Sequence, residues 1–480
     1  MRQLALDSPD GSDGKTSAAP TSAKRIVICV DGTLNAEQSN TNVWRISNMI
    51  PSRGEDGVEQ VVIYQRGVGL KTNSFTDIAN VGDVALGANI EDYILRAYRA
   101  LAAIYCVGDD IFVSPFASVP RCALCNTDTI VPQMFGFSRG AYICQELADM
   151  ISELGILAPH APITPELLYR FTKLGDPLRK VSDYFGKTDD ELKAMEFNER
   201  FVAENLRNFS SVCRVKYMGI FDTVGAIAYK SKGHFRMYPS KSIMRGRHAI
   251  GIDERRKTFV PDVWVRPADA AEPESEFDFE QRWFCGSHSN IGGGYDFDYL
   301  PQFALHWVMQ GAIREGLAFL QITPLTGADC CDCPVRHELN ESTNVFGEAL
   351  SKTDEVFAKF FGNVKGWDHR VIGGEITRGT DQLRLLGETI DASVFYKMYY
   401  DSGYNPAEML KWMKDMSMST QETAICTRRA SNGLPRTARA VSVWQCEEIR
   451  AGSAPNSRGP ANKHDKPSFW ATILRKSPGK

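Results

Sequence analysis

A serine between two glycines is the residue whose surroundings most strongly predict chemistry in this chain. Residues 136–140 read Gly-Phe-Ser-Arg-Gly, the G-x-S-x-G spacing, and they lie where a short apolar run meets a helical pattern. A serine at such a strand-to-helix bend adopts a strained backbone conformation, and the two glycines let strand and helix approach each other. Ser138 is therefore a candidate nucleophile. The alternative is a solvated serine in a glycine-rich turn.

A serine hydroxyl attacks a carbonyl group when a base takes up its proton and a carboxylate orients that base. Asp222 follows the apolar run 215–221, and His288 follows the run 283–285 and precedes a glycine-rich turn. The chain order Ser, acid, His is that of α/β hydrolases, so we predict a triad of Ser138, Asp222 and His288. A turn aspartate and a core histidine are the structural alternatives. Asp31 and Asp253 are alternative acids, and His248 and His306 are alternative bases.

Acyl transfer also needs hydrogen-bond donors aimed at the developing oxyanion. In an α/β hydrolase, one donor is the backbone N–H of the residue after the nucleophile, here Arg139, and the second comes from a loop after an early strand. Gly32 or Thr33 is the expected second donor, because both follow the apolar run that ends at Val30. Asp31 precedes the serine in the chain, so a structural role in this loop suits it better than a place in the triad.

The patterning around these residues predicts an α/β fold of the α/β-hydrolase type, with a mostly parallel sheet, helices on both faces and a helical cap insertion. Apolar, β-branched runs alternate with stretches in which apolar residues recur every three or four positions. We expect strands at 25–30, 60–64, 110–113, 135–137, 214–221 and 282–285, and helices at 90–105, 139–154, 300–319, 340–361 and 406–418.

The domain boundaries follow from the same patterns. We expect a disordered leader at 1–24, a catalytic domain at 25–320, a C-terminal helical extension at 321–426 and a largely disordered tail at 427–480. Residues 160–210 carry helical patterning and predict a cap within the catalytic domain, which could form an apolar lid over the site.

The strand that leads to Ser138 is interrupted in the sequence. Residues 113–134 are weakly patterned and separate two apolar runs that would otherwise form one strand. Because Val113-Ser114 can be encoded GTGAGT and Gln133 can be encoded CAG, we hypothesise that 113–133 is a retained intron. The gene would then be eukaryotic, and sequencing of the mature transcript tests this hypothesis.

Composition excludes several classes of protein. The chain has 480 residues, of which 43% are apolar and 24% are charged, as in ordinary globular proteins. A formal net charge of −4 gives no basic field for holding nucleic acid, so no nucleic-acid partner is expected. No stretch approaches eighteen uninterrupted apolar residues, and no signal core precedes residue 25, so we expect a cytoplasmic protein with at most peripheral membrane contact.

Seven ordered blocks between about 25 and 320 resemble the uncharacterised α/β-hydrolase domain related to type VI secretion phospholipase effectors. The resemblance implies a Ser/Asp/His hydrolase whose bacterial members cleave phospholipid esters, with Ser138, Asp222 and His288 at the matching positions. The family commonly has Asp where this chain has Asn290, and its strand before the serine is uninterrupted. The blocks are Val30 to Asn35, Thr41 to Trp44, Gly67 to Gly69, Gly136 to Ala141, Phe221 to Gly225, His248 to Arg256 and His288 to Tyr295.

Other chemistries have weaker support. The cysteines at 122, 125, 330, 331 and 333 could hold zinc, but no matched second pair follows at finger spacing, so no metal or other cofactor is expected. Asp-Gly-Thr-Leu at 31–34 also resembles haloacid-dehalogenase phosphatases, but Cys29 stands where those enzymes need a nucleophilic aspartate. No phosphate-binding G-x-x-x-x-G-K-[ST] loop occurs. The rival to a serine esterase is a non-catalytic binding module with an α/β-hydrolase fold.

Overall fold

The fold was determined as a computed structural model of the full chain. Apart from a few positions within these ranges, the residues that it describes are 24–67, 90–105, 132–174, 187–225, 239–267, 278–320 and 376–415, together with 335, 370, 372 and 442–443. The predicted strand at 110–113, the predicted helix at 340–361, most of the 113–134 insert and the cysteines at 122, 125, 330, 331 and 333 lie outside the described residues.

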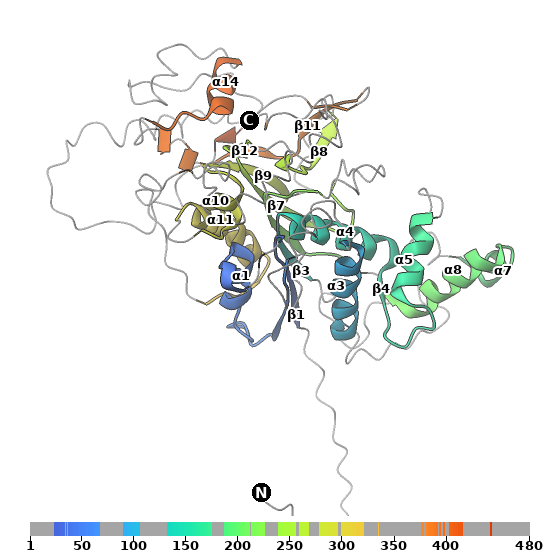
Figure 1. The fold of residues 1–480 in the computed structure, drawn as a ribbon. Helices are drawn as coiled ribbons and strands as arrows, with labels where there is room; N and C mark the ends of the chain where they lie inside the picture. The colour runs from blue at the N-terminus through green and yellow to red at the C-terminus, as the bar shows by residue number, and fades with distance from the viewer. Residues whose placement is uncertain are drawn as a thin grey trace, which may run out of the picture.

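A parallel sheet of eight strands forms the centre of the molecule (Figure 1). Its strands lie in the order β13-β12-β9-β7-β6-β3-β1-β2, and every neighbouring pair is parallel. The strands are β1 (Arg25–Val30), β2 (Gln60–Gln65), β3 (Gln133–Phe137), β6 (Tyr217–Phe221), β7 (Arg245–Gly251), β9 (Asp278–Phe284), β12 (Glu388–Ile390) and β13 (Ser442–Val443). The predicted α/β-hydrolase-like sheet is confirmed.

The side chains of β1 show why this run forms a central strand. Ile26, Ile28 and Val30 enter one hydrophobic cluster, and Val27 and Cys29 enter another on the opposite face of the sheet. All five are fully buried. A strand that is covered on both faces needs apolar residues at successive positions, and this run supplies them.

Helices cover both faces of the sheet. One face carries α1 (Asn42–Met49), which follows the short 3-10 turn η1 (Glu37–Ser39), together with α10 (His288–Gly292) and α11 (Leu300–Arg314). The other face carries α3 (Ile90–Tyr105) and α4 (Arg139–Leu154). The predicted bounds of α3 and α4 agree with the structure, because each has a continuous apolar stripe at helical spacing.

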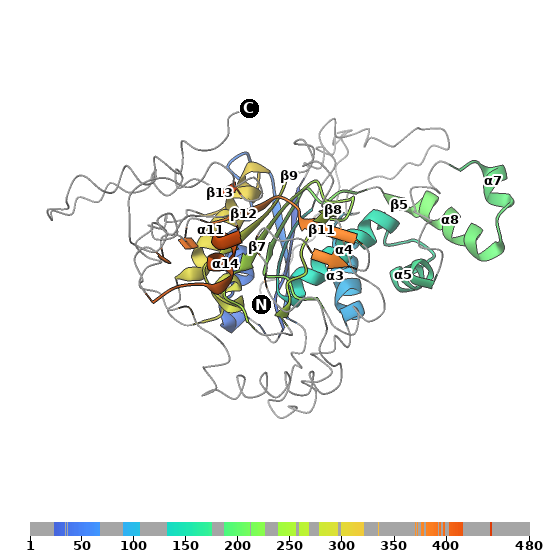
Figure 2. The same cartoon turned by 90° about the horizontal axis from the view of Figure 1, so that it is seen from above.

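The helical segment predicted as a cap lies on the flank of the molecule. It contains α5 (Pro165–Leu174), α7 (Asp189–Lys193) and α8 (Phe197–Phe209), and β4 (Ile156–Leu157) pairs with β5 (Ser210–Ser211) at its base. Figures 1 and 2 both place α7 and α8 beyond α3 and α4, away from α11. β4 follows the end of α4 that is remote from Ser138, and a lid over the serine stays a prediction.

The C-terminal region differs from the predicted helical extension and tail. β10 (Ile376–Arg378) and β11 (Asp381–Leu385) form a second, antiparallel sheet with β8 (Val265–Pro267), and α14 (Ala407–Asp415) is the described helix of this region. β12 and β13 extend the central sheet beside β9. Strands of two to five residues carry too little alternation to be recognised in the sequence, so these strands were not predicted, whereas α14 confirms the predicted helix at 406–418.

Strand β3 is continuous up to the serine. It begins at Gln133, within the last two residues of the predicted insert, and pairs with β1 on one side and β6 on the other. The described end of the insert is therefore an ordinary part of the ladder. The retained-intron hypothesis for 113–133 stays a prediction.

The strand order creates a switch point between β1 and β3. The chain passes from β1 to β2 on one side, then crosses back to β3 and continues outward through β6, β7 and β9. In open parallel sheets, ligands bind beyond the carboxyl ends of the strands at such a point. Gly32 and Ser138 lie just after the two strands that flank it.

Among the described residues, no helix has both the length and the apolar composition needed to cross a bilayer.

Candidate active site

Ser138 occupies a strained bend between β3 and α4. Its φ of 55° and ψ of −124° lie outside the helical and extended regions, and its side chain makes no hydrogen bond that caps α4. A Cβ atom on Gly136 would lie 2.5 Å from Cα of Ala141, and one on Gly140 would lie 2.2 Å from the carbonyl oxygen of Val30. Both glycines are therefore required for the close approach of strand and helix, as the sequence predicts.

The backbone of Ser138 is bonded to residues on either side of Asp222. Its N–H donates to the carbonyl oxygen of Phe221 at 3.0 Å, and its carbonyl oxygen accepts from the N–H of Val224 at 3.3 Å. Asp222 itself has a φ of 39°. Strained backbone of this kind concentrates at functional sites, and here it occurs at both Ser138 and Asp222.

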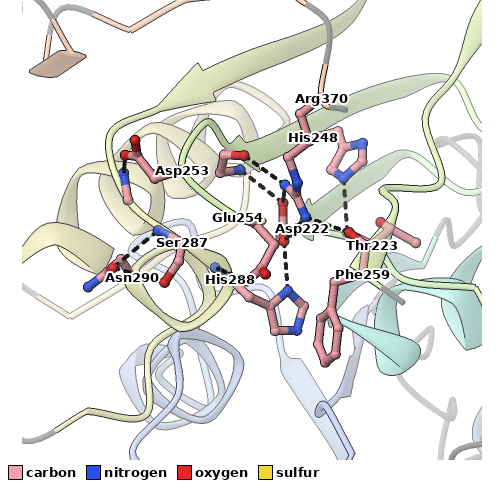
Figure 3. A network of polar contacts seen from close by, with 12 residues as sticks. Asp222, Thr223, His248, Asp253, Glu254, Phe259, Ser287, His288, Asn290 and Arg370 are labelled. Carbon is pink, nitrogen blue, oxygen red and sulfur yellow. Dashed lines mark hydrogen bonds and ion pairs between the residues drawn. The ribbon is translucent and has the colours of Figure 1, made fainter. Parts of the chain in front are cut away.

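Asp222 and His288 are in direct contact (Figure 3). Asp222 Oδ2 lies 2.6 Å from Nδ1 of His288, and Asp222 Oδ1 accepts from the N–H of Gly251 at 2.9 Å. Asp222 is fully buried, and His288 is 5% exposed. The contact joins the end of β6 to the first residue of α10, in agreement with the acid and base predicted from the sequence.

Two aromatic rings and a carboxylate fix the position of His288. The ring of Phe137, the residue before Ser138, lies 4.7 Å from the imidazole between centroids, and the ring of Phe259 lies 4.8 Å away in an edge contact. The backbone N–H of His288 donates to Oε2 of Glu254 at 3.2 Å. Because Phe137 is bonded covalently to Ser138, its contact brings the imidazole to the bend.

No hydrogen bond joins Ser138 Oγ to His288 in the described part of the chain. In unliganded enzymes, the bond between nucleophile and base is often long and tightens when substrate binds. The structure thus brings the base beside the elbow through Phe137.

Arg370 is a member of the site that the sequence analysis missed. Its guanidinium group donates to both carboxylate oxygens of Asp222, from Nη1 to Oδ1 and from Nη2 to Oδ2. Burial alone would raise the pKa of the Asp222 carboxyl, but the charge of Arg370 and hydrogen bonds from His288 and Arg370 hold it well below its usual range. Asp222 therefore stays ionised. No local motif marks Arg370, because it lies 148 residues beyond its partner in the chain.

The loop after β1 lies against the nucleophile. A Cβ atom on Gly32 would be 3.2 Å from Cβ of Ser138. The N–H of Gly32 already donates to Oδ1 of Asp31 at 2.8 Å. In the described part of the chain, no backbone hydrogen bond takes up the N–H of Thr33 or Arg139. The structure therefore favours Thr33 over Gly32 as the second oxyanion donor.

The side chain of Asp31 supports this loop through hydrogen bonds and does not orient a histidine. Its Oδ2 accepts from the hydroxyl groups of Thr41 at 2.7 Å and Tyr64 at 2.8 Å. Burial raises the pKa of the Asp31 carboxyl to about 6, against hydrogen bonds from Thr41, Tyr64 and Gly32 that lower it. Thr33 is fixed from the other side, because its Oγ1 accepts from Nη1 of Arg139 at 2.7 Å.

The alternative acid and bases have other contacts. Asp253 Oδ2 accepts from the N–H of Gly286 at 2.8 Å and from the hydroxyl group of Tyr404 at 2.8 Å, so it supports the turn before His288. His306 lies on α11, where its Nδ1 is 3.5 Å from Nε2 of Gln310.

His248 is a buried support of the acid. The N–H of Thr223, the residue after Asp222, donates to its Nε2 at 3.1 Å, and its Nδ1 is 3.2 Å from Oε1 of Gln281. Because Nε2 accepts a hydrogen bond, the proton of the neutral ring is on Nδ1. Burial lowers the pKa of His248 from 6.5 to about 4. His248 therefore orients the backbone after Asp222 as a neutral ring.

Asn290 caps the helix that carries His288. Its Oδ1 accepts from both the N–H and the hydroxyl group of Ser287 at 3.1 Å. These bonds need an acceptor oxygen and no charge, and the amide of Asn290 supplies one. The described residues contain no group of three or more His, Cys, Asp or Glu side chains suited to a metal ion. Cys29, Cys144, Cys213 and Cys285 are buried, and none of these four described cysteines is in a disulfide.

Comparisons with known proteins match the region that contains this site. A family model described as type VI secretion system (T6SS) phospholipase effector Tle1-like, catalytic domain, matches residues 24–311. The uncharacterized protein YEL023C of Saccharomyces cerevisiae is 25% identical over 272 residues, which cover 52% of this chain and 34% of that protein. The chain thus spans about a third of the length of this curated relative.

Two solved structures show a weaker likeness. The Tle1 effector bound to the VgrG spike of the type 6 secretion system is 17% identical, with a TM-score of 0.30 over 58% of this chain and 52% of that chain. An uncharacterized protein from Pseudomonas aeruginosa is 13% identical, with a TM-score of 0.32 over 94% of this chain and 62% of that chain. The fold assignment rests instead on the strand order described above.

The matched residues 24–311 include the elbow, the loop after β1, Asp222 and His288, and they make up more than half of the chain. The chain therefore belongs to the family of the T6SS phospholipase effector Tle1-like catalytic domain.

Proposed function

We propose that this chain is a serine hydrolase that cleaves carboxylic esters through Ser138, His288 and Asp222, with an acyl-enzyme intermediate. The observation that carries the proposal is the 2.6 Å contact between Asp222 Oδ2 and His288 Nδ1 beside a strained serine elbow. The ionised carboxylate accepts a hydrogen bond from the N–H at Nδ1, which leaves Nε2 of the imidazole as the basic nitrogen.

The reaction follows from these positions. Nε2 of His288 takes the proton of Ser138 as Oγ bonds to the ester carbonyl carbon. The C–O bond to the alcohol then breaks, and the alcohol leaves with the proton from the imidazolium. Water attacks the acyl-enzyme by the same route, which releases the acid and restores Ser138. Asp222 keeps its negative charge throughout and stabilises the imidazolium in both steps.

Two backbone N–H groups are candidates for binding the oxyanion. Arg139 is the first residue of α4, so the positive end of the helix dipole adds to the stabilisation of an oxyanion by its N–H. The N–H of Thr33 comes from the loop that touches Ser138, and the hydrogen bond from Arg139 to Thr33 Oγ1 ties the two donor residues together. We propose Arg139 and Thr33 as the oxyanion hole.

The family supports phospholipid as the substrate class. Its description is that of a phospholipase effector, so we propose that the ester belongs to a phospholipid. Short-chain nitrophenyl esters compared with phospholipid vesicles test this point. Turnover of both classes supports phospholipid hydrolysis, and turnover of the short esters alone restricts the proposal to a general esterase.

Labelling with a fluorophosphonate tests the nucleophile. The purified full chain is expected to gain the label on the peptide that contains Ser138, and Ser138→Ala is expected to lose both the label and about 10⁴- to 10⁶-fold of ester hydrolysis. Ser47→Ala is the matched control, because Ser47 donates to the carbonyl oxygen of Trp44 on α1 and should leave both readouts unchanged. A folded wild-type chain that never takes the label would contradict the proposal and leave a binding module.

A further inference from the structure

The acid of the site is held by a residue beyond the region that the family model matches. Arg370 follows α11 in the chain, whereas the matched region ends at residue 311. Arg370 is 5% exposed, and its two terminal nitrogens face the two carboxylate oxygens of Asp222 (Figure 3). This bidentate arrangement sets both the position and the plane of a carboxylate, which a single hydrogen bond does not do.

The same guanidinium group binds two further parts of the site. Its Nη1 donates to the carbonyl oxygen of Gly251 at 2.7 Å, and its Nη2 donates to the carbonyl oxygen of Phe259 at 2.8 Å. Gly251 also donates its N–H to Asp222 Oδ1, and the ring of Phe259 packs against His288. Arg370 therefore contacts the acid, the backbone that supports the acid and the residue that forms one wall around the base.

The charge of Arg370 offsets the cost of burying Asp222. The Asp222 side chain is fully buried, and an unpaired carboxylate there would be strongly destabilising. A guanidinium group stays protonated at every accessible pH, so Arg370 is a permanent positive partner of Asp222. No other arginine or lysine forms an ion pair with Asp222 among the described residues.

We propose that Arg370 is a positioning residue of the active site: it keeps Asp222 ionised and aimed at Nδ1 of His288, so a segment outside the matched family region completes the catalytic machinery. This inference rests on the proposed function, because it assigns Arg370 a role in activating Ser138. Arg370 has no part in binding substrate, since all four of its hydrogen bonds go to the protein interior.

Removing this charge acts on the protonation of Asp222. Without Arg370, burial is no longer offset and the Asp222 carboxyl becomes easier to protonate. The ionised carboxylate that orients His288 is then lost at higher pH than in the wild type. The low-pH limb of kcat/KM should therefore move towards alkaline pH.

The main test replaces Arg370 with Met, which keeps an unbranched side chain but removes the guanidinium group and its charge. Arg370→Met is expected to lower kcat about ten- to a hundredfold, the range seen for groups that orient a functional histidine in metal sites, with little change in KM. The low-pH limb is expected to rise by about one pH unit or more. The measurements are kcat, KM and the rate of fluorophosphonate labelling between pH 5 and 9 on the full chain.

A second variant separates charge from geometry. Arg370→Lys keeps the positive charge but cannot bind both oxygens of Asp222 and both carbonyl groups at once. It should retain the wild-type low-pH limb and show a reduced kcat. This variant also serves if Arg370→Met fails to fold, because a wild-type kcat in folded Arg370→Lys would contradict positioning by the bidentate contact.

Arg282→Met is the matched control for losing a buried arginine. Arg282 is 8% exposed, and its guanidinium group binds Glu280 at 2.6 Å and Asp391 at 3.4 Å rather than the acid of the site. Its loss should lower stability and leave the pH profile of the folded fraction unchanged.

The outcomes distinguish this inference from the proposed function. Wild-type kcat and an unshifted pH profile in folded Arg370→Met would overturn the role of Arg370 while the wild type still takes the label. A wild-type chain without labelling at Ser138 would overturn the serine hydrolase itself. An equal pH shift in Arg282→Met would show that the shift reports general destabilisation, and this result would also overturn the inference.

Discussion

Asp222 Oδ2 lies 2.6 Å from Nδ1 of His288, although 66 residues separate them in the chain. The contact forms because β6 and β9 end at the same edge of the parallel sheet, with only β7 between them. Asp222 follows β6 directly, and His288 follows β9 after a short turn. Ser138 follows β3, the neighbour of β6 on its other side, so the ends of β3, β6 and β9 bring the three residues to one edge of the sheet.

Removing the charge of Asp222 is expected to abolish most of the activity. Asp222→Asn retains the size of the side chain but can present an amide N–H to His288, which disfavours the required tautomer. We expect kcat to fall about 10⁴-fold, as for the same change in other triads. Asp262→Asn makes the same change at a partly exposed position and should leave kcat unaltered. Activity in Asp222→Asn within tenfold of wild type would remove Asp222 from the triad.

Adding one methyl group at Gly140 is expected to disrupt the elbow. A Cβ atom there would lie 2.2 Å from the carbonyl oxygen of Val30 and 2.4 Å from that of Asp31, both of them backbone atoms of a buried strand end. Gly140→Ala should lower the free energy of unfolding by about 1–3 kcal/mol and displace the loop that donates to the oxyanion.

Chemical denaturation and the rate of fluorophosphonate labelling measure these two effects. The control is Gly57→Ala, because a Cβ on Gly57 meets nothing within 4 Å. Its only cost is the backbone strain of a non-glycine residue at a φ of 79°. Equal labelling rates in both variants would contradict the requirement for glycine at position 140.

Asp31 makes the stability of the fold depend on pH. Its folded-state pKa of about 6 lies above the unfolded value of 3.8, so its contribution is fully present below about pH 4 and is lost as pH rises through 6. Asp31→Asn removes this dependence. As pH rises from 4 to 7, the free energy of unfolding of Asp31→Asn should rise by about 3 kcal/mol relative to that of the wild type. A constant difference across this range, measured by urea denaturation, would refute the raised pKa.

His248 is expected to act in the opposite direction. Its folded-state pKa of about 4 lies below the unfolded value of 6.5, so its contribution is present above about pH 6.5 and is lost as pH falls through 4. His248→Gln leaves an oxygen that can accept from the N–H of Thr223. As pH falls from 7 to 4, the free energy of unfolding of this variant should rise by about 3 kcal/mol relative to that of the wild type.

The contributions of Asp31 and His248 largely cancel in the wild type, since they have opposite signs and similar windows. The two single variants should therefore show opposite slopes, and the double variant Asp31→Asn/His248→Gln should return to a slope close to that of the wild type. Slopes of the same sign in both single variants would contradict this account.

The elbow and its flanking elements could be predicted because their determinants are local. Gly136 is required because the backbone of Ala141, five residues on, lies against it, and Gly140 because the end of β1 does. The helix α4 follows from the apolar stripe of its own sequence. The order of Asp222 and His288 after apolar runs indicated strand ends, and parallel strands place such ends at one edge of the sheet. These inferences need only short-range sterics and periodicity.

The sequence left the second oxyanion donor open between Gly32 and Thr33. The tertiary structure favours Thr33, because Gly32 donates its N–H to the side chain of Asp31, which is itself held by Thr41 and Tyr64. The placement of α7 and α8 on the flank was also beyond sequence patterning, since an amphipathic helix does not indicate which surface it will cover.

Residue types and their spacing thus determined the sheet and the bend at Ser138, and they singled out the acid and base that we propose. Packing decided that Arg370, 148 residues beyond Asp222, lies within hydrogen-bonding distance of both its oxygens. A buried ion pair has no signature in the sequence around either partner, because it forms only when the sum of many distant contacts brings two charges out of water together.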